Sequence, residues 1–371
     1  MKGIVIWAQS ICRSVMGLYA EVQRQSECPV KITLYHCDRY SENMRSVIGL
    51  RNDEFSSVEM IPVGHDLQRG RQVIEETREW LHVFCIWQKA PEYRQLMAEI
   101  KKCGGKYAIA CEAPCNMHYG VRRLIQKIYY RTLLPLRGKS VIENADFFLN
   151  YSGCDDRVAK LIGWRNEKII PFGYFPPPLE KSNFIKRTAN QPFVILSTGI
   201  MSKHRGADVL VRGLHELSRR GVAYKAIMTQ KGALYDSMKE YARKFNLPIE
   251  FPGFVEMGDL IRMYETCSVF VGSGRDEPWG MRLNDALNCG APLIVSRGMG
   301  GVKMIDDYHC GLSFRNEDYI DLAEKLQSLA DDEDLYLSCA ENVVESYSEI
   351  SPAAQAKNFL NSCRKCMVVD V

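Results

Sequence analysis

The stretch from Ser268 to Ser296, SVFVGSGRDEPWGMRLNDALNCGAPLIVS, constrains the fold more than any other part of the chain. Val269–Val271 and Ala291–Ser296 are short apolar runs typical of buried parallel strands. Between them, Pro278–Cys289 is a predicted helix, because proline suits a first helical turn and Gly290 can cap the last turn. A strand, a helix and a second strand form a right-handed crossover. This crossover places the loop and the helix N-terminus at the carboxyl ends of the strands, where ligands bind.

The loop of this unit carries groups that suit a phosphorylated sugar. We expect the backbone N–H groups of Trp279, Gly280 and Met281 to lie at the positive end of the helix dipole, where an anion binds favourably. Glu277 precedes them, and Asp285 follows Glu277 by eight residues, which offsets the two by only about 80° around a helix. Both carboxylates can therefore face one crevice. Carboxylates accept hydrogen bonds from sugar hydroxyls, which lie beside the diphosphate of a nucleotide sugar.

The rest of the chain repeats the alternation of strands and helices. In the first half, strands are expected at 3–8, 30–37, 57–63, 81–88, 106–113 and 145–151. The alternation restarts at Phe193, after the proline-rich stretch Phe172–Leu179. This pattern predicts two parallel, doubly wound α/β domains. No Gly-x-Gly-x-x-Gly follows the first strand, which argues against dinucleotide binding in the first half.

The segment GRDEPWGMRLNDALNCGAPLIVS resembles the signature of retaining family 4 glycosyltransferases of the GT-B fold, in which two glutamates are separated by seven residues. The resemblance implies that Glu277 approaches the hydroxyls of the donor sugar and that Asp285 holds the ribose. Aspartate at the second position shortens the reach by one methylene. The resemblance is strong from about Phe193 to Leu329 and architectural before it.

The resemblance also implies a domain layout. Two Rossmann-like domains face a cleft, and a C-terminal helix crosses back to the first domain. The expected boundaries are 1–172 for the acceptor-side domain, 173–190 for the linker, 191–350 for the nucleotide-sugar-binding domain and 351–371 for the returning helix and tail.

A second motif lies in the turn Gly199–Gly206, GIMSKHRG. Related enzymes have Gly-Arg-x-x-x-x-Lys-Gly here, and the Arg and Lys clamp the donor diphosphate. In this chain Arg205 takes the lysine position and Ile200 replaces the arginine, so Lys203 is a candidate for the second charge. By the same resemblance, the nucleobase is bordered by Gly253, Phe254 and Val255.

Two polar residues follow the fifth expected strand. The resemblance makes Glu112 and His118 candidates for binding the acceptor or the donor sugar across the cleft. The alternative is that they are an ordinary loop carboxylate and a surface imidazole.

The segment 120–139 interleaves six Lys and Arg residues with apolar residues and contains no acid. A basic amphipathic helix of this kind can lie on an anionic membrane surface. It can equally pack on the sheet and leave its basic face in water.

Charge and cysteine usage limit the remaining classes. A net charge of +3 does not argue for nucleic-acid binding. The 14 cysteines include one Cys-x-x-Cys pair, at Cys363 and Cys366, so we expect reduced thiols and no metal site. No Asp-x-Asp lies in a suitable loop, and no cofactor or catalytic metal is expected. No signal peptide or membrane-spanning run is found, so we expect a cytoplasmic protein. If the segment 120–139 binds anionic lipid, the protein is peripheral on the inner face of the cell membrane.

The leading hypothesis is a retaining glycosyltransferase of polysaccharide biosynthesis. It would move a sugar from a UDP- or GDP-linked donor to a hydroxyl of a glycan acceptor, and the resemblance implies that this acceptor is lipid-linked. The candidate catalytic residues are Glu277, Arg205 and His118. Two alternatives remain open: an inactive GT-B binding subunit, or a GT-B sugar-nucleotide epimerase.

Overall fold

The computed structural model describes residues 1–10, 12–36, 60–114, 121–153, 156–186, 188 and 192–368. The chain forms two compact units. The first consists of Met1–Pro177 and Ser351–Val371, and the second is Pro178–Ile350. The first unit is therefore discontinuous in sequence, whereas the second is continuous.

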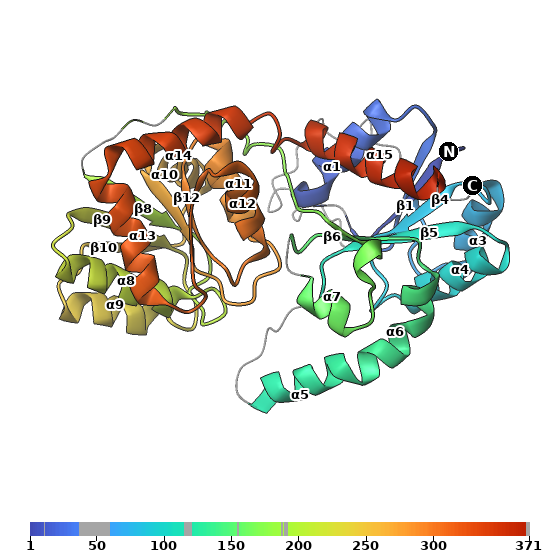
Figure 1. Cartoon of the computed structure of the whole chain (residues 1–371), viewed down its shortest axis with the longest axis horizontal. Helices are drawn as coiled ribbons and strands as arrows, with labels where there is room; N and C mark the ends of the chain where they lie inside the picture. Colours follow the sequence, from blue (N-terminus) through green and yellow to red (C-terminus); the bar gives the residue numbers. More distant parts are fainter. Residues whose placement is uncertain are drawn as a thin grey trace. The chain divides into compact units, whose positions relative to one another are not determined.

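The first unit contains a parallel sheet, whose seven described strands run in the order β3-β2-β1-β4-β5-β6-β7. Figure 1 labels β1, β4, β5 and β6 of this sheet. Its strands are β1 (Ile4–Ala8), β2 (Val30–Leu34), β3 (Met60–Pro62), β4 (Leu81–Phe84), β5 (Lys106–Cys111), β6 (Phe148–Asn150) and β7 (Ile169–Pro171). Its helices are α1 (Arg13–Gln25), α3 (Leu67–Glu76), α4 (Pro91–Lys102), α5 (Val121–Arg131), α6 (Leu133–Asn144), α7 (Arg157–Leu161), η1 (Asn166–Lys168) and α15 (Pro352–Val368).

The expected strands agree with this sheet except at their ends. The expected strands at 30–37 and 57–63 lie partly outside the described residues. The strand expected at 145–151 is shorter, because Ala145 caps the end of α6 and the carboxylate of Asp146 accepts a hydrogen bond from the Tyr107 N–H at 2.9 Å.

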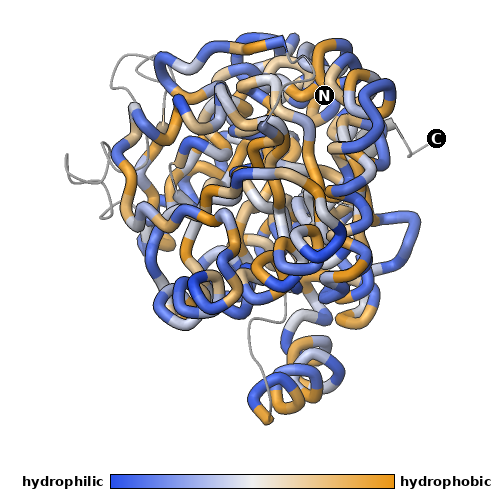
Figure 2. Tube along the Cα trace, turned by 90° about the vertical axis from the view of Figure 1, so that its left-hand side faces the viewer, coloured by the Kyte–Doolittle hydropathy of each residue, from blue (hydrophilic) through white to orange (hydrophobic). Residues whose placement is uncertain are grey.

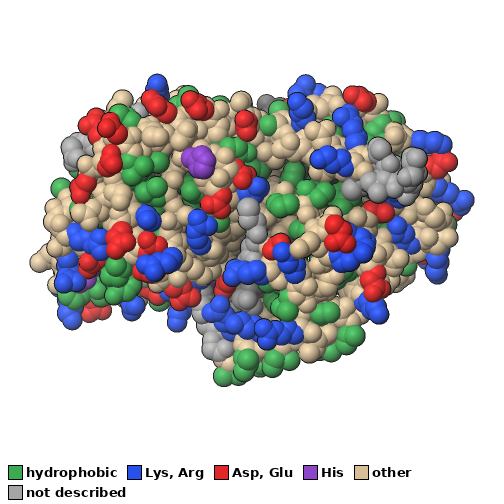
Figure 3. Space-filling view, viewed as in Figure 1, with side chains coloured by type: hydrophobic (Ala, Val, Ile, Leu, Met, Phe, Trp, Pro, Cys, Tyr) green, Lys and Arg blue, Asp and Glu red, His purple; other side chains and the backbone are tan. Residues whose placement is uncertain are grey.

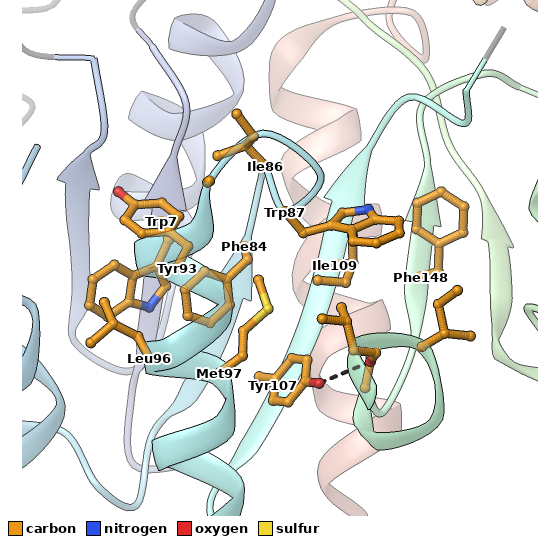
Figure 4. Packing of buried hydrophobic residues seen from close by; sticks show 14 of the residues in the cluster. Trp7, Phe84, Ile86, Trp87, Tyr93, Leu96, Met97, Tyr107, Ile109 and Phe148 are labelled. Atoms are coloured by element: carbon orange, nitrogen blue, oxygen red, sulfur yellow. Dashed lines mark hydrogen bonds between the residues drawn. The ribbon is translucent and has the colours of Figure 1, made fainter. Parts of the chain in front are cut away.

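Both faces of this sheet are covered by apolar side chains, as continuous apolar strands require. Val5 and Trp7 point into one core, and Ile4 and Ile6 into the other. In the first core, Trp7 stacks on Phe84 with ring centroids 5.1 Å apart (Figure 4).

The second core of this unit includes residues from the end of the chain. Helix α15 buries Ala356, Phe359, Leu360 and Cys363 in the same cluster as Met16 of α1. The prediction that the C-terminal helix returns to the first domain is therefore confirmed (Figure 1).

The second unit has a parallel sheet whose described strands run in the order β10-β9-β8-β11-β12-β13. The strands are β8 (Phe193–Ser197), β9 (Tyr224–Thr229), β10 (Ile249–Gly253), β11 (Val269–Gly272), β12 (Leu293–Ser296) and β13 (Gly311–Phe314). The helices are α8 (Ala207–Arg219), α9 (Tyr235–Lys244), α10 (Met257–Thr266), α11 (Met281–Asn288), η2 (Gly300–Val302), α12 (Lys303–Tyr308), α13 (Tyr319–Asp331) and α14 (Glu333–Ser346).

Each sheet has one point where the strand order reverses. It lies between β1 and β4 in the first unit and between β8 and β11 in the second. In doubly wound sheets, ligands bind outside the carboxyl ends of the strands at such a point. The predicted fold class, two doubly wound parallel α/β units, is confirmed.

Candidate active site

The reversal point of the second sheet brings the two motif loops together. One loop follows β8 and contains Arg205; the other follows β11 and contains Glu277. A cavity of about 30 Å³ lies between them. It is lined by Ser197, Thr198, Arg205, Phe270, Val271, Gly272, Ser273, Gly274, Glu277, Gly280, Arg282, Leu283 and Met299.

A glycine allows the close approach of these loops. Gly206 caps the start of α8 in the left-handed conformation, with φ of 69°. A Cβ at this position would lie 1.8 Å from the carbonyl oxygen of Ser273. The Ser273 hydroxyl in turn donates to the carbonyl of Arg205 at 3.0 Å. Only glycine therefore fits where the two loops meet.

A buried ion pair fixes the first loop to the second. The guanidinium of Arg275 donates two hydrogen bonds to the carboxylate of Asp208, at 2.8 and 2.7 Å. It also donates to the carbonyl of Lys203, and the Arg275 N–H donates to the carbonyl of His204 at 3.0 Å. Burial alone would raise the pKa of Asp208, but the hydrogen bonds from Arg275 lower that pKa below its ordinary value. Arg275 thus holds the Arg205 loop through two backbone carbonyls and through Asp208 of α8, the helix that follows the loop.

The two leading candidates from the sequence lie in direct contact. Arg205 and Glu277 form an ion pair, and the Glu277 side chain is only 9% exposed. The backbone of Glu277 is held by the loop after β12. Its N–H donates to the carbonyl of Gly298 at 3.0 Å, and its carbonyl accepts from Gly300 at 2.9 Å. A carboxylate and a guanidinium thus face the same small cavity from opposite loops.

The surroundings of the pair are positively charged. Burial, followed by the charges of Arg205 and Arg275, lowers the pKa of His204 below its ordinary value of 6.5. His204 is therefore neutral at physiological pH, while the guanidinium groups stay charged. Such a site favours an anionic ligand.

The helix of the signature starts later than the sequence predicts. Gly280, with φ of 103°, is the left-handed N-cap of α11, and the helix runs from Met281 to Asn288. Pro278 is therefore not in the first turn, and that prediction was wrong. Trp279 precedes the helix and is buried, with its indole N–H donating to Asn284 at 2.8 Å.

Asp285 lies on α11, is 9% exposed, and is absent from the described lining of the cavity. Its charge is close enough to add to the effect of burial in raising the pKa of Tyr264. Tyr264 shares a hydrogen bond of 2.7 Å with Thr198, which does line the cavity. Glu277 thus lines the cavity itself, while Asp285 is placed beside Tyr264.

The residues expected around the nucleobase follow β10, two strands away from β8. Gly253 ends the strand with φ of 77°, and its carbonyl accepts from Gln230. The Phe254 side chain is 76% exposed. Neither they nor Val255 line the cavity, and their role stays a prediction.

Lys203 and Arg282 differ in their position relative to the cavity, and the donor-binding role of Lys203 stays a prediction. The Lys203 side chain is exposed and absent from the described lining of the cavity, while its carbonyl accepts from Arg275. Arg282, which sequence reasoning missed, lines the cavity from the first turn of α11. No such signal is present in the sequence, because the helix predicted from Pro278 places Arg282 beyond its first turn, whereas the observed start at Met281 places it within that turn.

The first unit has its own cavity, of about 320 Å³, at the reversal point between β1 and β4. Glu112 lines it, together with the aromatic side chains Tyr19, Trp87, Tyr151 and Tyr174. Burial raises the pKa of the neighbouring Cys85 thiol to about 12, so this thiol is protonated at neutral pH. The other candidate, His118, lies outside the described residues.

The basic segment forms two helices rather than one. Pro135 lies in the first turn of α6 and lacks the N–H that would continue α5, so the break falls at Thr132. Exposed apolar side chains gather on both helices: Val121, Leu124, Ile125, Ile128, Leu133 and Leu136 are between 49% and 74% exposed. Figure 2 shows apolar and polar residues alternating along α5, and Figure 3 shows a band of Lys and Arg beside the apolar side chains.

None of the described helices has the length and hydropathy needed to cross a bilayer. In the described part of the chain, no three His, Cys, Asp or Glu side chains are grouped so as to hold a metal ion.

Two parallel, doubly wound units with a returning C-terminal helix define the GT-B fold, and solved structures agree. HepE from Anabaena, in complex with UDP and glucose, matches with a TM-score of 0.62 and 13% identity, over 98% of this chain and 100% of that chain. The lipopolysaccharide outer core galactosyltransferase WaaB matches with a TM-score of 0.67 and 13% identity, over 98% of this chain and 99% of that chain. At this identity the likeness shows the fold.

Sequence comparison adds a match to the second unit. Residues 180–345 match the family Glycosyl transferases group 1. D-inositol 3-phosphate glycosyltransferase of Corynebacterium kroppenstedtii is 25% identical over 45% of this chain and 39% of its own length. N,N'-diacetylbacillosaminyl-diphospho-undecaprenol alpha-1,3-N-acetylgalactosaminyltransferase of Campylobacter jejuni is 28% identical over 28% of this chain and 27% of its own length. The matched regions span less than half the length of these curated relatives.

Proposed function

We propose that the chain is a glycosyltransferase that moves a sugar from a nucleotide-diphosphate sugar to a hydroxyl of a glycan acceptor, with retention of configuration. The observation that carries the proposal is the Arg205–Glu277 ion pair in a cavity at the reversal point of the second sheet. The match of residues 180–345 to Glycosyl transferases group 1 supports the transferase class.

The ion pair gives each partner a role. Arg205 binds the donor diphosphate, because a guanidinium forms bidentate hydrogen bonds with phosphate. Glu277 accepts hydrogen bonds from the hydroxyls of the transferred sugar. The cavity of about 30 Å³ holds roughly one water molecule. The donor therefore binds as the two side chains separate, and its diphosphate replaces Glu277 as the partner of Arg205.

Catalysis in this arrangement comes from positioning and charge stabilisation. The glycosidic bond to the diphosphate breaks as the acceptor hydroxyl attacks the same face of the sugar. The departing diphosphate takes up the proton of that hydroxyl. Arg205 stabilises the negative charge that develops on the leaving group.

The acceptor is assigned to the cavity of the first unit. Its volume of about 320 Å³ lies at the lower end of the range for small-molecule pockets, about 300–1,000 Å³. Aromatic side chains form apolar surfaces against which a sugar ring packs, and Glu112 accepts hydrogen bonds from sugar hydroxyls.

The acceptor is lipid-linked, and the enzyme meets it at an anionic membrane surface. Val121, Leu124, Ile125 and Ile128 recur at helical spacing on α5 and are all more than half exposed. Lys and Arg residues flank this stripe. Apolar side chains enter the acyl boundary while the cations contact anionic headgroups.

A turnover assay tests the transferase proposal. Purified protein is incubated with UDP-, GDP- and ADP-sugars and glycan acceptors, and the released diphosphate and the anomeric configuration of the product are measured. We expect acceptor-dependent release from one donor and a retained configuration. Glu277→Gln should lose activity, whereas the control Glu250→Gln, on the edge strand β10, should keep it. No consumption of any donor would indicate a binding subunit, and an altered sugar nucleotide without transfer would indicate an epimerase.

Vesicle co-sedimentation tests the membrane component. We expect the protein to bind vesicles that contain anionic lipid and not neutral vesicles. Ile125→Glu should abolish binding, because it places a negative charge in the apolar stripe. Val344→Glu, a change at an exposed apolar residue of α14, is the matched control and should bind as the wild type does. Equal binding by both variants would refute the assignment of α5.

A further inference from the structure

We infer that Arg282 binds the donor diphosphate together with Arg205, and so supplies the second positive charge that position 200 lacks. This inference rests on the proposed function of the same site. It assigns a ligand-binding role to a residue that no signature position marks.

The first support is the position of the guanidinium. Arg282 lies in the first turn of α11 and lines the cavity that Arg205 and Glu277 also line. Its guanidinium covers the backbone of Gly199. A Cβ built on Gly199 would lie 2.4 Å from Cζ of Arg282 and 2.5 Å from its Nη1. Gly199 also has φ of 115°, so a glycine both makes the turn and leaves room for the guanidinium.

The second support is the lack of an anionic partner. Arg205 pairs with Glu277, and Arg275 pairs with Asp208. In the described chain, no carboxylate forms an ion pair with Arg282, although its side chain is half-buried. A cation in the first turn is further disfavoured by the helix dipole. An arginine in this place is stabilised by an anion that binds in the cavity.

The third support is that neither Ile200 nor Lys203 belongs to the described lining of the cavity. The Ile200 side chain is 55% exposed and lies over Gly232, where a Cβ would be 2.8 Å from Ile200 Cγ2. Lys203 is exposed and stands outside the described lining of the cavity. Arg205 and Arg282 are the arginines that line it, and they come from different elements. A diphosphate between them is bound from two sides, each by a group suited to bidentate contact.

Calorimetry on the full chain tests this assignment. UDP, GDP and ADP are titrated, with uridine, guanosine and adenosine as probes that lack phosphate. For the nucleoside diphosphate that the wild type binds, we expect Arg282→Gln to weaken affinity about tenfold or more, which is the effect of losing a charge-assisted contact. Affinity for the matching nucleoside should stay the same. Arg282→Lys, which keeps the charge, should recover part of the loss, and Lys203→Ala should bind as the wild type does.

The outcomes separate this inference from the proposed function. If the wild type binds a nucleoside diphosphate and Arg282→Gln binds it equally well, the Arg282 assignment is overturned while the donor site stands. If Lys203→Ala rather than Arg282→Gln loses affinity, Lys203 supplies the charge. If the wild type binds none of the three diphosphates, the proposed function fails, and the inference fails with it. Thermal unfolding of each variant verifies its fold, and Arg282→Lys provides the test if Arg282→Gln does not fold.

Discussion

Replacing Asp208 with asparagine removes the carboxylate that accepts two hydrogen bonds from the buried Arg275 guanidinium. The Arg275 side chain is 5% exposed and that of Asp208 is 20% exposed, so water replaces little of the lost interaction. Breaking a buried ion pair costs about 3–5 kcal/mol. We expect the lower end, about 3 kcal/mol, because the carbonyl of Lys203 and the carboxylate of Glu317, 3.4 Å from Arg275 Nε, remain.

The Arg275–Asp208 ion pair should also make the effects of its two substitutions non-additive, and its contribution to the free energy of unfolding should depend on pH. Arg275→Met combined with Asp208→Asn should cost less than the sum of the single changes, because neither leaves the other unpaired. The pKa of Asp208 is lowered in the folded state, so its stabilisation is present above the unfolded value of 3.8 and is lost as the pH falls through the folded value. The deficit of Asp208→Asn should therefore be constant near neutral pH and shrink in strong acid.

Urea-dependent hydrogen exchange on the full chain measures the loss in unfolding free energy of the second unit, through peptides from β8, α8 and β11. Calorimetry with the bound nucleoside diphosphate then shows whether the loop of Arg205 has moved. A loss below about 1 kcal/mol for Asp208→Asn, or additive single effects, would refute the assignment of Arg275 and Asp208 as the clamp of the site.

Further tests concern the glycine between the two loops, a buried histidine of the first unit and the metal dependence of transfer. Gly206→Ala should lower Tm and abolish nucleoside-diphosphate binding, because its Cβ would lie 1.8 Å from the Ser273 carbonyl oxygen. The control is Gly221→Ala, where φ is 80° and no atom lies within 4 Å of the added Cβ. It should cost about 1 kcal/mol of backbone strain and leave binding intact. Burial lowers the pKa of His82 to about 4, whereas the unfolded chain binds the proton near pH 6.5. The first unit should therefore lose about 3 kcal/mol between pH 6.5 and pH 4, and His82→Gln should flatten this dependence in hydrogen exchange of β4. Finally, we propose that no catalytic metal takes part, so EDTA should leave transfer activity unchanged, and a loss that Mg²⁺ restores would contradict this proposal.

The order of strands and helices could be predicted because the strands are buried on both faces. Val269–Val271 is apolar throughout and became β11, with Gly272 added. The helix start could not be predicted, because Pro278 is a plausible first-turn residue in isolation. The close packing of Gly280 against Met299, where a Cβ would lie 2.4 Å from Cε, moves the N-cap to Gly280. That contact exists only in the folded unit.

The residues of the candidate site also divide into those that the sequence predicts and those that only the folded structure shows. Glu277 and Arg205 could be found because each occupies a signature position, and the structure brings them into contact. Lys203 could be proposed from its nearness in sequence to Arg205, and in the structure its carbonyl accepts a hydrogen bond from Arg275 of the second loop. Arg282 comes from another element, and only tertiary packing places it over Gly199.

The discontinuous first unit affects how the protein is made. Residues 1–177 leave the ribosome well before α15. This helix supplies Phe359 and Leu360 to the second core of the first unit. The second unit has all of its own core residues once Ile350 has emerged. Domains usually fold in the order of synthesis. Here we expect the donor-binding half to complete its core first. The first half has α1 on this face of its sheet but lacks the side chains of α15 until that helix is translated, and we expect chaperones to bind the part of the face that α15 later covers.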